Sequence, residues 1–499
     1  MYFRKSVWAN GGDFDDPILL WYAQGVGEMQ KRPLSDSTSW RFLAAIHGIN
    51  YESWAKYGYY TQGEAMPPQP EQRTYWDQCQ HHSWYFLPWH RGYLLSLEAI
   101  VRQAVIQLGG PADWALPYWD YSATDGNARQ LPPAFSRKML PDGSANPLYV
   151  AQRWGADDGT LPLPQKDVSL KQLNDIRFVG ASSGGSPGFG GPETVFHHGG
   201  GSSGGLEQLP HNVVHVDIGG TLQNDAGLMT DPDTAGLDPI FYLHHANIDR
   251  LWAYWLTLGG GRSNPSEQAW LNGPVSRLFV VPAADGTPWR FVPHNVLTTE
   301  ELDYQYSPLG NNDPIPVPRA SRAQLLGFAA PSVAPLVAPA GKPTAELIGA
   351  NDSQIKISHA SKSTVAIDSR MMARCARSFS SEAIAKSFRN EPNRFHLNLE
   401  SIRANVEGLN IDVHINLDGK QVFVAPIGLF GAKKASQTDL SHGGEGITVV
   451  LDITDMLDEL HLAKGIDSLA NFEVIITPRK PLADNVELSI ERISLYREF

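Results

Sequence analysis

The stretch that decides the fold is HHSWYFLPWHRGYLLSLEAIVRQAV, which spans residues 81–105. Pro88 suits the first position of a helix, where no amide hydrogen is needed. His90 therefore lies in the first turn of a predicted helix. His81 is nine residues earlier and would face the opposite side of a continuous helix, so it comes from the preceding loop if both histidines bind one metal. The apolar residues that recur at helical spacing are Trp89, Leu94, Leu97, Val101 and Val105.

A third histidine ends another apolar run, WRFLAAIH at residues 40–47. Trp40, Leu43 and Ile46 mark the buried face of this predicted helix. Two helices and one loop can thus supply three imidazoles to a single metal. These three are His47, His81 and His90.

A second group of histidines begins in LEQLPHNVVHVDIGG, residues 206–220. Pro210 again suits the start of a helix. His211 and His215 are four residues apart, so they lie one turn from each other on the same helix face. This is a geometry that chelates a metal ion.

The partner of this pair comes from LDPIFYLHHANIDRLW, residues 237–252. His244 and His245 are consecutive and diverge by about 100° around a helix, so only one of them can join the same metal. We choose His245, because it shares its face with Phe241, Ile248 and Trp252. The remaining histidines of this half are predicted to be ordinary core or surface residues: His82, His197, His198 and His244.

Two trios of imidazoles restrict which metal ions can bind. The absence of a carboxylate in ligand register disfavours non-haem iron, magnesium and calcium, whereas three histidines per metal suit zinc or copper. Zinc has no redox chemistry and needs only one trio to activate water. A zinc hydrolase that uses one trio is therefore the alternative from another class of enzyme. Two copper ions, by contrast, can each give one electron to O2. We therefore expect two copper ions per chain.

Composition limits the other functions. The chain has 499 residues, 42% of them hydrophobic and 19% charged, which is typical of a globular protein with two domains. Its formal charge of −13 and the lack of clustered Lys and Arg argue against nucleic acid or an anionic membrane as a partner. The start of the sequence lacks the apolar core of a secretion signal, and no stretch is long enough to cross a bilayer. We expect a cytoplasmic protein.

The composition changes after residue 310. Residues 311–350 are rich in Pro and Ala and lack periodicity, as linkers do. Residues 351–499 contain runs that alternate apolar and polar side chains and a helical run at 455–465, which predicts a β-sandwich interrupted by a short helix. Residues 1–310 are predicted to form a mainly α-helical catalytic domain whose helical bundle holds the metals. The alternating runs are 395–399, 411–417, 447–453, 472–477 and 488–496.

A glycine-rich stretch interrupts the first domain. Residues 180–205 read GASSGGSPGFGGPETVFHHGGGSSGG. Because Gly, Ser and Pro dominate it, we expect a mobile surface loop.

The two histidine regions resemble those of a known family. Residues 81–98 are similar to the first copper motif of tyrosinases, catechol oxidases and haemocyanins, and residues 210–215 and 238–252 resemble the second. The resemblance implies that one copper is bound by His47, His81 and His90. It implies that the other is bound by His211, His215 and His245.

Other parts of the chain extend the resemblance. Arg4 and the run Tyr304–Tyr306 resemble elements that tie the start of the copper domain to its end in plant polyphenol oxidases. The C-terminal runs resemble the β-sandwich of those enzymes, although Asn410 and Ile411 replace their usual Lys and Phe. The resemblance implies that this domain shields the copper site and keeps the enzyme latent.

The family implies an activity, the oxidation of phenols by O2. Small phenols and O2 are then the partners of the chain, and no nucleic acid or membrane is expected. Glu207 and Asn212 resemble a pair that orients a water molecule during hydroxylation of monophenols, which favours a tyrosinase. Val216 and Phe241 are candidates for the substrate pocket, and Phe86 and Phe241 are expected to pack on ligand imidazoles. The alternatives are a catechol oxidase or o-aminophenol oxidase, or a haemocyanin-like oxygen-binding protein.

Two residues near the ligands carry further hypotheses. Cys79 stands two residues before His81, the position from which fungal relatives form a thioether to the ligand imidazole, and we expect the same bond here. Asp249 stands four residues after His245 and is the favoured acceptor for the outer nitrogen of that ring. A salt bridge of Asp249 with Arg250 or another basic residue is the alternative.

Overall fold

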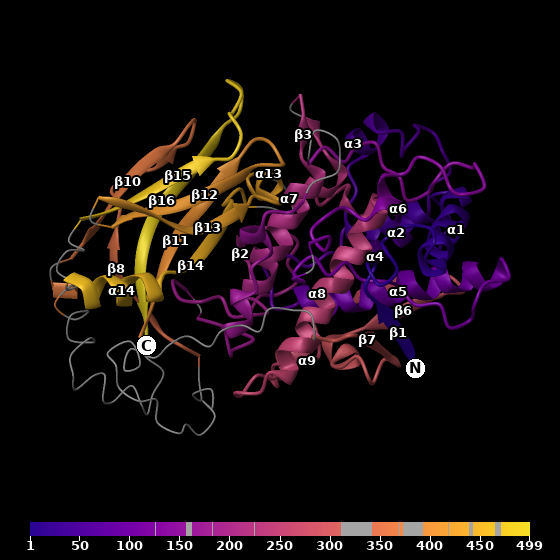
Figure 1. Ribbon diagram of the computed structural model, residues 1–499, viewed down its shortest axis with the longest axis horizontal. Helices are drawn as coiled ribbons and strands as arrows, with labels where there is room; N and C mark the ends of the chain where they lie inside the picture. The colour runs from indigo at the N-terminus through magenta and orange to yellow at the C-terminus, as the bar shows by residue number, and fades with distance from the viewer. Residues whose placement is uncertain are drawn as a thin grey trace.

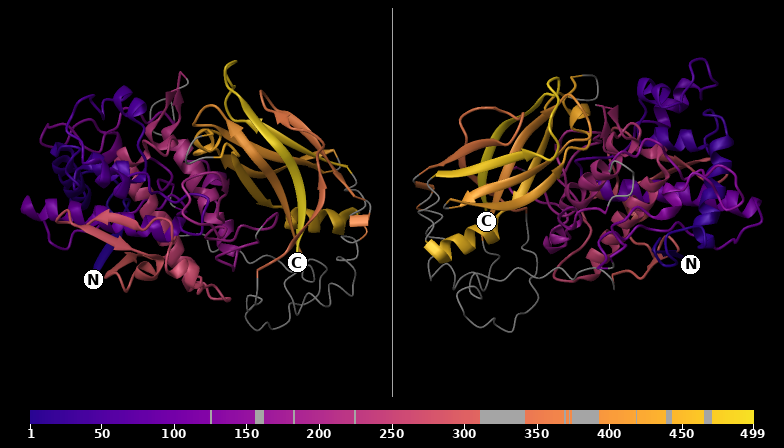
Figure 2. Two further views of the ribbon diagram at one scale, coloured as in Figure 1. Left: turned by 180° about the vertical axis from the view of Figure 1, so that it is seen from behind. Right: turned by 45° about the horizontal axis from the view of Figure 1, so that its top comes forward.

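The structure is a computed structural model that divides into a helical part and a sheet part (Figure 1). Two further views keep the parts side by side, so they do not merely overlap in projection (Figure 2). None of the described helices combines the length and apolarity needed to cross a bilayer. The described residues are 1–124, 126–155, 162–181, 183–223, 225–310, 342–368, 370–371, 373, 393–417, 419–438, 443–464 and 471–499.

Five helices build the part that carries the histidines: α1 (Pro17–Lys31), α2 (Trp40–His47), α5 (Phe86–Gln107), α7 (Val213–Gly219) and α8 (Pro239–Thr257). Side-chain oxygens of Asp16, Ser39 and Asp238 accept backbone hydrogen bonds at the starts of α1, α2 and α8. α5 is buried on almost every face, which makes it the central helix. It begins two residues before Pro88, so the predicted start was late and His90 lies beyond the first turn. The shorter helices are α3 (Tyr51–Lys56), α4 (Gln69–Tyr75), α6 (Pro133–Ser136), α9 (Gln268–Leu271), α13 (Ala432–Ala435) and α14 (Thr454–Lys464).

The start of the helical part is tied to its end, as the resemblance implied. β1 (Tyr2–Lys5) lies parallel to β7 (Tyr304–Ser307). Arg4 on β1 is fully buried, and its guanidinium donates hydrogen bonds to Glu98, Asp249 and the Tyr306 hydroxyl. Two small hairpins complete this part: β3 (Thr221–Leu222) with β4 (Asp225–Ala226), and β5 (Phe279–Pro282) with β6 (Pro288–Phe291).

The strands of the second part, together with β2 of the helical part, form one continuous path, β13-β12-β15-β10-β8-β16-β11-β14-β2, with β9 paired to β16. The predicted alternating runs are strands, but they join in this single path rather than in two separate sheets. The pairing between β8 and β10 is short, because these strands share only two residue pairs. Apolar side chains from the strands on both sides of this short pairing pack into one core. The bounds are β2 (Gly201–Ser202), β8 (Ala345–Ala350), β9 (Ile355–Lys356), β10 (Ser361–Ile367), β11 (Arg394–Ala404), β12 (Asn410–Leu417), β13 (Lys420–Gly428), β14 (Ile447–Asp452), β15 (Asn471–Pro478) and β16 (Leu488–Glu498).

The short helix predicted at residues 455–465 is α14. The strands β8, β9, β10 and β13 were not predicted from the sequence. Residues 311–341 of the predicted linker lie outside the described residues. The division into domains at 310 and 351 therefore stays a prediction.

The glycine-rich stretch 180–205 is a surface loop only in part. Residues 185–191 are buried, and β2 pairs with β14 of the sheet, whereas Glu193 and Val195 are exposed as expected. A Cβ on Gly180 would lie 1.8 Å from the carbonyl oxygen of Ser186, so the backbone folds tightly onto itself there. Glycine serves close packing at this position, because no side chain fits.

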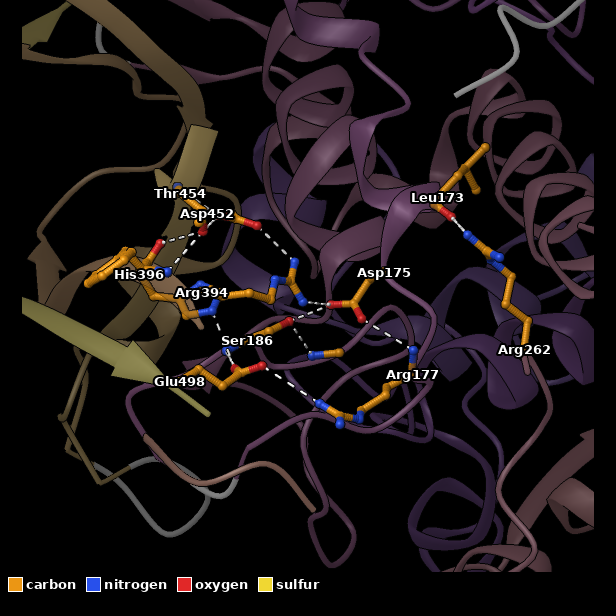
Figure 3. Close-up of polar contacts among 12 residues, drawn as sticks. Leu173, Asp175, Arg177, Ser186, Arg262, Arg394, His396, Asp452, Thr454 and Glu498 are labelled. Atoms are coloured by element: carbon orange, nitrogen blue, oxygen red, sulfur yellow. Dashed lines mark hydrogen bonds and ion pairs between the residues drawn. The ribbon is translucent and has the colours of Figure 1, made fainter. Parts of the chain in front are cut away.

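Polar contacts join this stretch to the sheet. The backbone amide of Ser186 donates to the carboxylate of Glu498 at 2.7 Å. Figure 3 shows Glu498 between the two parts and Arg394 reaching from β11 toward Asp175. The Arg394 guanidinium lies 3.5 Å from Asp175 and 2.8 Å from Asp452.

A second ionic contact lies at the same boundary, around Arg479. Its guanidinium forms two hydrogen bonds of 2.6 Å to Asp167, whose side chain is fully buried. Asp217 lies 3.5 Å away and Asp412 3.0 Å away. One arginine of the sheet part thus neutralises carboxylates of both parts.

Arg479→Met is expected to lower the free energy of unfolding by about 3 kcal/mol, because it leaves buried carboxylates without a cation. Thermal and urea unfolding measure the change. The control is Lys362→Met, which removes an exposed pair with Glu473 and should cost less than about 1 kcal/mol. Equal effects of the two variants would contradict the role given to Arg479.

Candidate metal centre

The structure brings the first predicted trio together. His47 ends α2, His81 lies in the loop before α5, and His90 lies on α5. Their ring centroids form a triangle with sides of 5.3, 5.5 and 5.7 Å. All three side chains are buried. The loop position predicted for His81 is correct.

The second predicted trio also converges. The Nε2 atom of His245 on α8 lies 3.3 Å from the Nε2 atoms of His211 and His215. Ligand nitrogens about 2.0–2.1 Å from a tetrahedral ion lie roughly 3.3 Å apart, so the spacing fits one metal ion. Leu209 before this helix is extended, which makes Pro210 the first helical residue, as predicted.

His244 belongs to the same cluster, although the sequence analysis set it aside. Ring nitrogens of His211, His215, His244 and His245 lie within 4.8 Å of one another. The Nδ1 atom of His244 lies 3.1 Å from the Tyr121 hydroxyl. The choice of His245 as the ligand stays a prediction, supported by its two 3.3 Å distances.

Hydrogen bonds fix the tautomers of four of these rings. Each Nδ1 atom faces an oxygen that only accepts, so it must carry the hydrogen, and Nε2 then turns its lone pair to the centre. Burial lowers the pKa of His47 to about 4 and that of His211 to about 3, which keeps the rings neutral and able to bind a metal. The four contacts are His47 with Pro232 O at 2.8 Å, His90 with Phe86 O at 2.8 Å, His211 with Asn212 Oδ1 at 2.8 Å and His215 with Met229 O at 2.7 Å.

Two phenylalanines hold the rings in place. Phe86 lies 4.6 Å from the ring of His90 and 4.7 Å from that of His211. Phe241 lies 4.8 Å from His47 and 4.2 Å from His245. The predicted packing of both residues on the imidazoles is confirmed.

The predicted pocket residues do not line the cavity beside the centre. Neither Val216 nor Phe241 belongs to its wall. Phe241 is committed to packing between imidazoles, and Val216 is buried. The wall consists of His81, His82, His198, Gly199, Pro232, Phe430, Gly431 and Lys434.

Phe430 is a site residue that the sequence analysis missed. It follows β13 of the sheet part, and its ring stacks on His215 with centroids 4.1 Å apart and planes at 22°. Its edge-on neighbours are His81 at 5.5 Å and His211 at 5.7 Å. Among the described residues of 342–499, it alone joins the apolar core of the helical part. Nothing in its local sequence distinguishes it from a core residue of the sheet.

Glu207 and Asn212 lie beside the second trio. Glu207 is buried, one of its carboxylate oxygens accepts from the His82 amide at 2.8 Å, and burial raises its pKa to about 8. Its other oxygen has no partner among the described residues. The Asn212 side-chain oxygen is engaged by His211, so Asn212 orients a candidate ligand, which the sequence analysis did not foresee. The shared water stays a prediction.

The role predicted for Asp249 is wrong. Its carboxylate accepts hydrogen bonds from Arg91 at 2.6 Å and from the hydroxyls of Tyr304 and Tyr306 at 2.6 Å each. The outer nitrogen of His245 has no partner among the described residues. Burial raises the pKa of Asp249, but Arg91 and Arg4 hold it below its ordinary value. The alternative of a salt bridge is correct, with these two arginines in place of Arg250.

The thioether between Cys79 and His81 stays a prediction. Cys79 is buried, and its Sγ atom lies 3.4 Å from Nδ1 of His81 and 3.3 Å from Nδ1 of His198. The thiol is therefore within reach of the His81 ring. An intact mass two hydrogens lower after copper loading would reveal the bond.

Comparison with known proteins identifies a family and relatives for the chain. The family model of the common central domain of tyrosinase matches residues 37–172 and 188–258, and a domain of unknown function (DUF7868) matches residues 344–498. Tyrosinase HcTyr1 of Hahella sp. (strain CCB-MM4) is 34% identical across the whole of both chains. Catechol oxidase B of Solanum tuberosum is 29% identical over 46% of this chain and 39% of its own length.

Solved structures share the fold. Latent apple tyrosinase has a TM-score of 0.56 at 21% identity, covering 99% of this chain and 97% of the other. Recombinant latent aurone synthase has a TM-score of 0.61 at 18% identity, covering 99% and 89%. The full-length match to HcTyr1 and the tyrosinase central domain lead to one conclusion. The chain belongs to the tyrosinase family.

Proposed function

We propose that the chain binds two copper ions and oxidises phenols with O2, hydroxylating monophenols at the ortho carbon and converting o-diphenols to o-quinones. The supporting observation is the convergence of two neighbouring trios of buried imidazoles, four of which have fixed tautomers. Copper, when bound, supplies the redox chemistry with O2. The trios are His47, His81 and His90, and His211, His215 and His245.

The other residues prepare the substrate. Phe86 and Phe241 hold the imidazoles and exclude water from behind them. A phenol must lose its proton, and its ordinary pKa is about 10. Glu207 has an unpartnered carboxylate oxygen, and burial raises its pKa to about 8. Its ionised form is therefore a stronger base than an ordinary carboxylate and accepts that proton.

A catechol oxidase without monophenol hydroxylation is the second candidate. It is favoured by Asn212, whose side-chain oxygen is occupied by His211 and cannot at the same time accept from a water molecule along that direction. Monophenol and diphenol rates distinguish the two.

The chain is expected to bind two copper ions, as counted by elemental analysis after loading and dialysis. His245→Ala should bind at most one, because its ring completes a trio, whereas His244→Ala should keep two. The control is His294→Ala. His294 is exposed and belongs to neither trio, so this variant should also keep two copper ions. One zinc ion per chain, with no copper retained, would contradict the proposal.

Glu207→Gln should lower kcat/KM for a monophenol by about a hundredfold, because it removes the base. The same change should lower kcat/KM for the matching diphenol much less, since a catechol needs no hydroxylation. Steady-state rates with 4-methylphenol and 4-methylcatechol measure both. Glu52→Gln, on the surface, is the control. Equal losses for the two substrates would exclude the role of Glu207.

We further propose that the sheet part keeps the enzyme latent through Phe430. Its ring covers His215 at 4.1 Å and occupies the space through which a phenol must approach. Two solved structures with the same fold are themselves titled latent forms.

Phe430→Ala should raise the catechol turnover of the full chain about tenfold or more, because it uncovers the imidazoles. The matched control is Phe423→Ala, on the strand β13 that precedes Phe430, which should leave turnover as it is, because its ring contacts His414 and Lys166 and none of the candidate ligands. Oxygen consumption with 4-methylcatechol measures the rate. No rise in the first variant, with copper content intact, would dismiss the proposal.

A further inference from the structure

The segment that covers the metal centre carries a second anchored side chain, Lys434. It lies four residues after Phe430, on α13. Its ammonium forms an ion pair with Asp233 and lies 3.0 Å from Nε2 of His198. Phe430 and Lys434 line the same small cavity together with His81 and His198. One short segment therefore places an aromatic ring over the imidazoles and a cation beside them.

The group that receives the ammonium belongs to the helical part. Ligand atoms of Asp77, His198 and Asp233 lie within 4.8 Å of one another. The Nδ1 atom of His198 lies 2.9 Å from the carbonyl oxygen of Cys79, so it carries the hydrogen, and Nε2 offers its lone pair to the cation. Two carboxylates and one imidazole lone pair thus face a single ammonium. We call these three residues the cation subsite.

The electrostatics of the cation subsite favour a positive charge. Burial lowers the pKa of Lys434, but Asp233 and Asp77 more than offset this and raise it above its ordinary value. The side chains of Lys434 and Asp233 are both 14% exposed, so water screens their attraction only in part. The ammonium of Lys434 is a direct observation of the kind of group that the cation subsite holds.

The cation subsite is next to the space that Phe430 fills. His81 contacts the Phe430 ring at 5.5 Å, and Cys79 bridges His81 and His198 with contacts of 3.4 and 3.3 Å. A molecule with an aromatic ring and a cationic arm has one group suited to each place. Phe430 and Lys434 have these two groups.

We propose that the segment from Phe430 to Lys434 imitates the substrate, and that the cation subsite selects phenols with an ammonium group on a short chain, the arylethylammonium class. This rests on the proposed function, because it names the substrate of the same site. Phenols with a carboxylate arm meet two carboxylates instead and are disfavoured. Uncharged phenols should have a kcat/KM between those of the ammonium and the carboxylate phenols.

The kinetic test uses the full chain with Phe430→Ala and Lys434→Ala, which uncovers both places. We expect this protein to show a higher kcat/KM for dopamine than for 4-methylcatechol, and the lowest for 3,4-dihydroxyphenylpropionate. Adding Asp233→Asn should lower the ratio of dopamine to 4-methylcatechol about tenfold, mainly through KM, because one charge of the cation subsite is lost.

The control must remove the same charge elsewhere, since a chain of net charge −13 attracts any cation. Asp225→Asn serves, because Asp225 pairs with Lys56 at the surface. Its ratio of dopamine to 4-methylcatechol should stay within twofold of the background. Equal changes of the ratio in the Asp225 and Asp233 variants, or a preference for the carboxylate substrate, would overturn the proposal.

A binding test separates this inference from the proposed function. Lys434→Ala in the full chain empties the cation subsite, so methylammonium chloride should raise the Tm of this variant more than sodium chloride at equal ionic strength. The extra rise should vanish in the double variant with Asp233→Asn. Equal effects of the two salts would refute the cation subsite even if catechols are oxidised. A specific effect of methylammonium would support the cation subsite even if no catechol is oxidised.

Discussion

The helical part is arranged around buried nitrogen lone pairs that face one another. Such an arrangement raises the free energy of the folded chain unless a cation lies between the nitrogens. The fixed tautomers sharpen the constraint, because a ring whose Nδ1 hydrogen is committed to a carbonyl oxygen cannot turn a hydrogen inward. Metal binding would relieve this repulsion, so its free energy would add to the stability of the fold.

The imidazoles keep their relative positions only if the helices that carry them are fixed. The ion pairs around Asp249 fix two of these helices. Arg91 follows the candidate ligand His90 on α5, and Asp249 stands one turn beyond His245 on α8. Their 2.6 Å contact therefore clamps together two helices that carry ligands of different trios. A buried charge pair is costly to desolvate, and here the hydrogen bonds from Arg4 and two tyrosine hydroxyls offset that cost.

The sequence predicted well what local physics decides. The pairing of His211 with His215 and the choice of His245 follow from helical spacing on α7 and α8. The failures at the site and at the boundary involve partners that are distant in the chain. Asp249 was assigned to a ring one turn away, whereas Arg4 is 245 residues away. The stretch 180–205 looked mobile because the sheet that pairs with β2 comes much later in the sequence. Phe430 looked like any apolar residue at a strand end.

The boundary between the two parts has the composition that the proposed latency requires. Each part has its own apolar core, and among the described residues of 342–499 only Phe430 enters the core of the helical part. Much of the remaining contact is ionic, as at Arg479 and Lys434. Ionic groups regain hydration when they separate, whereas a broad apolar face would stay exposed to aggregation. Concentrating the apolar contact in one aromatic side chain would therefore let the domain cover the centre and still leave it, as the proposed latency requires.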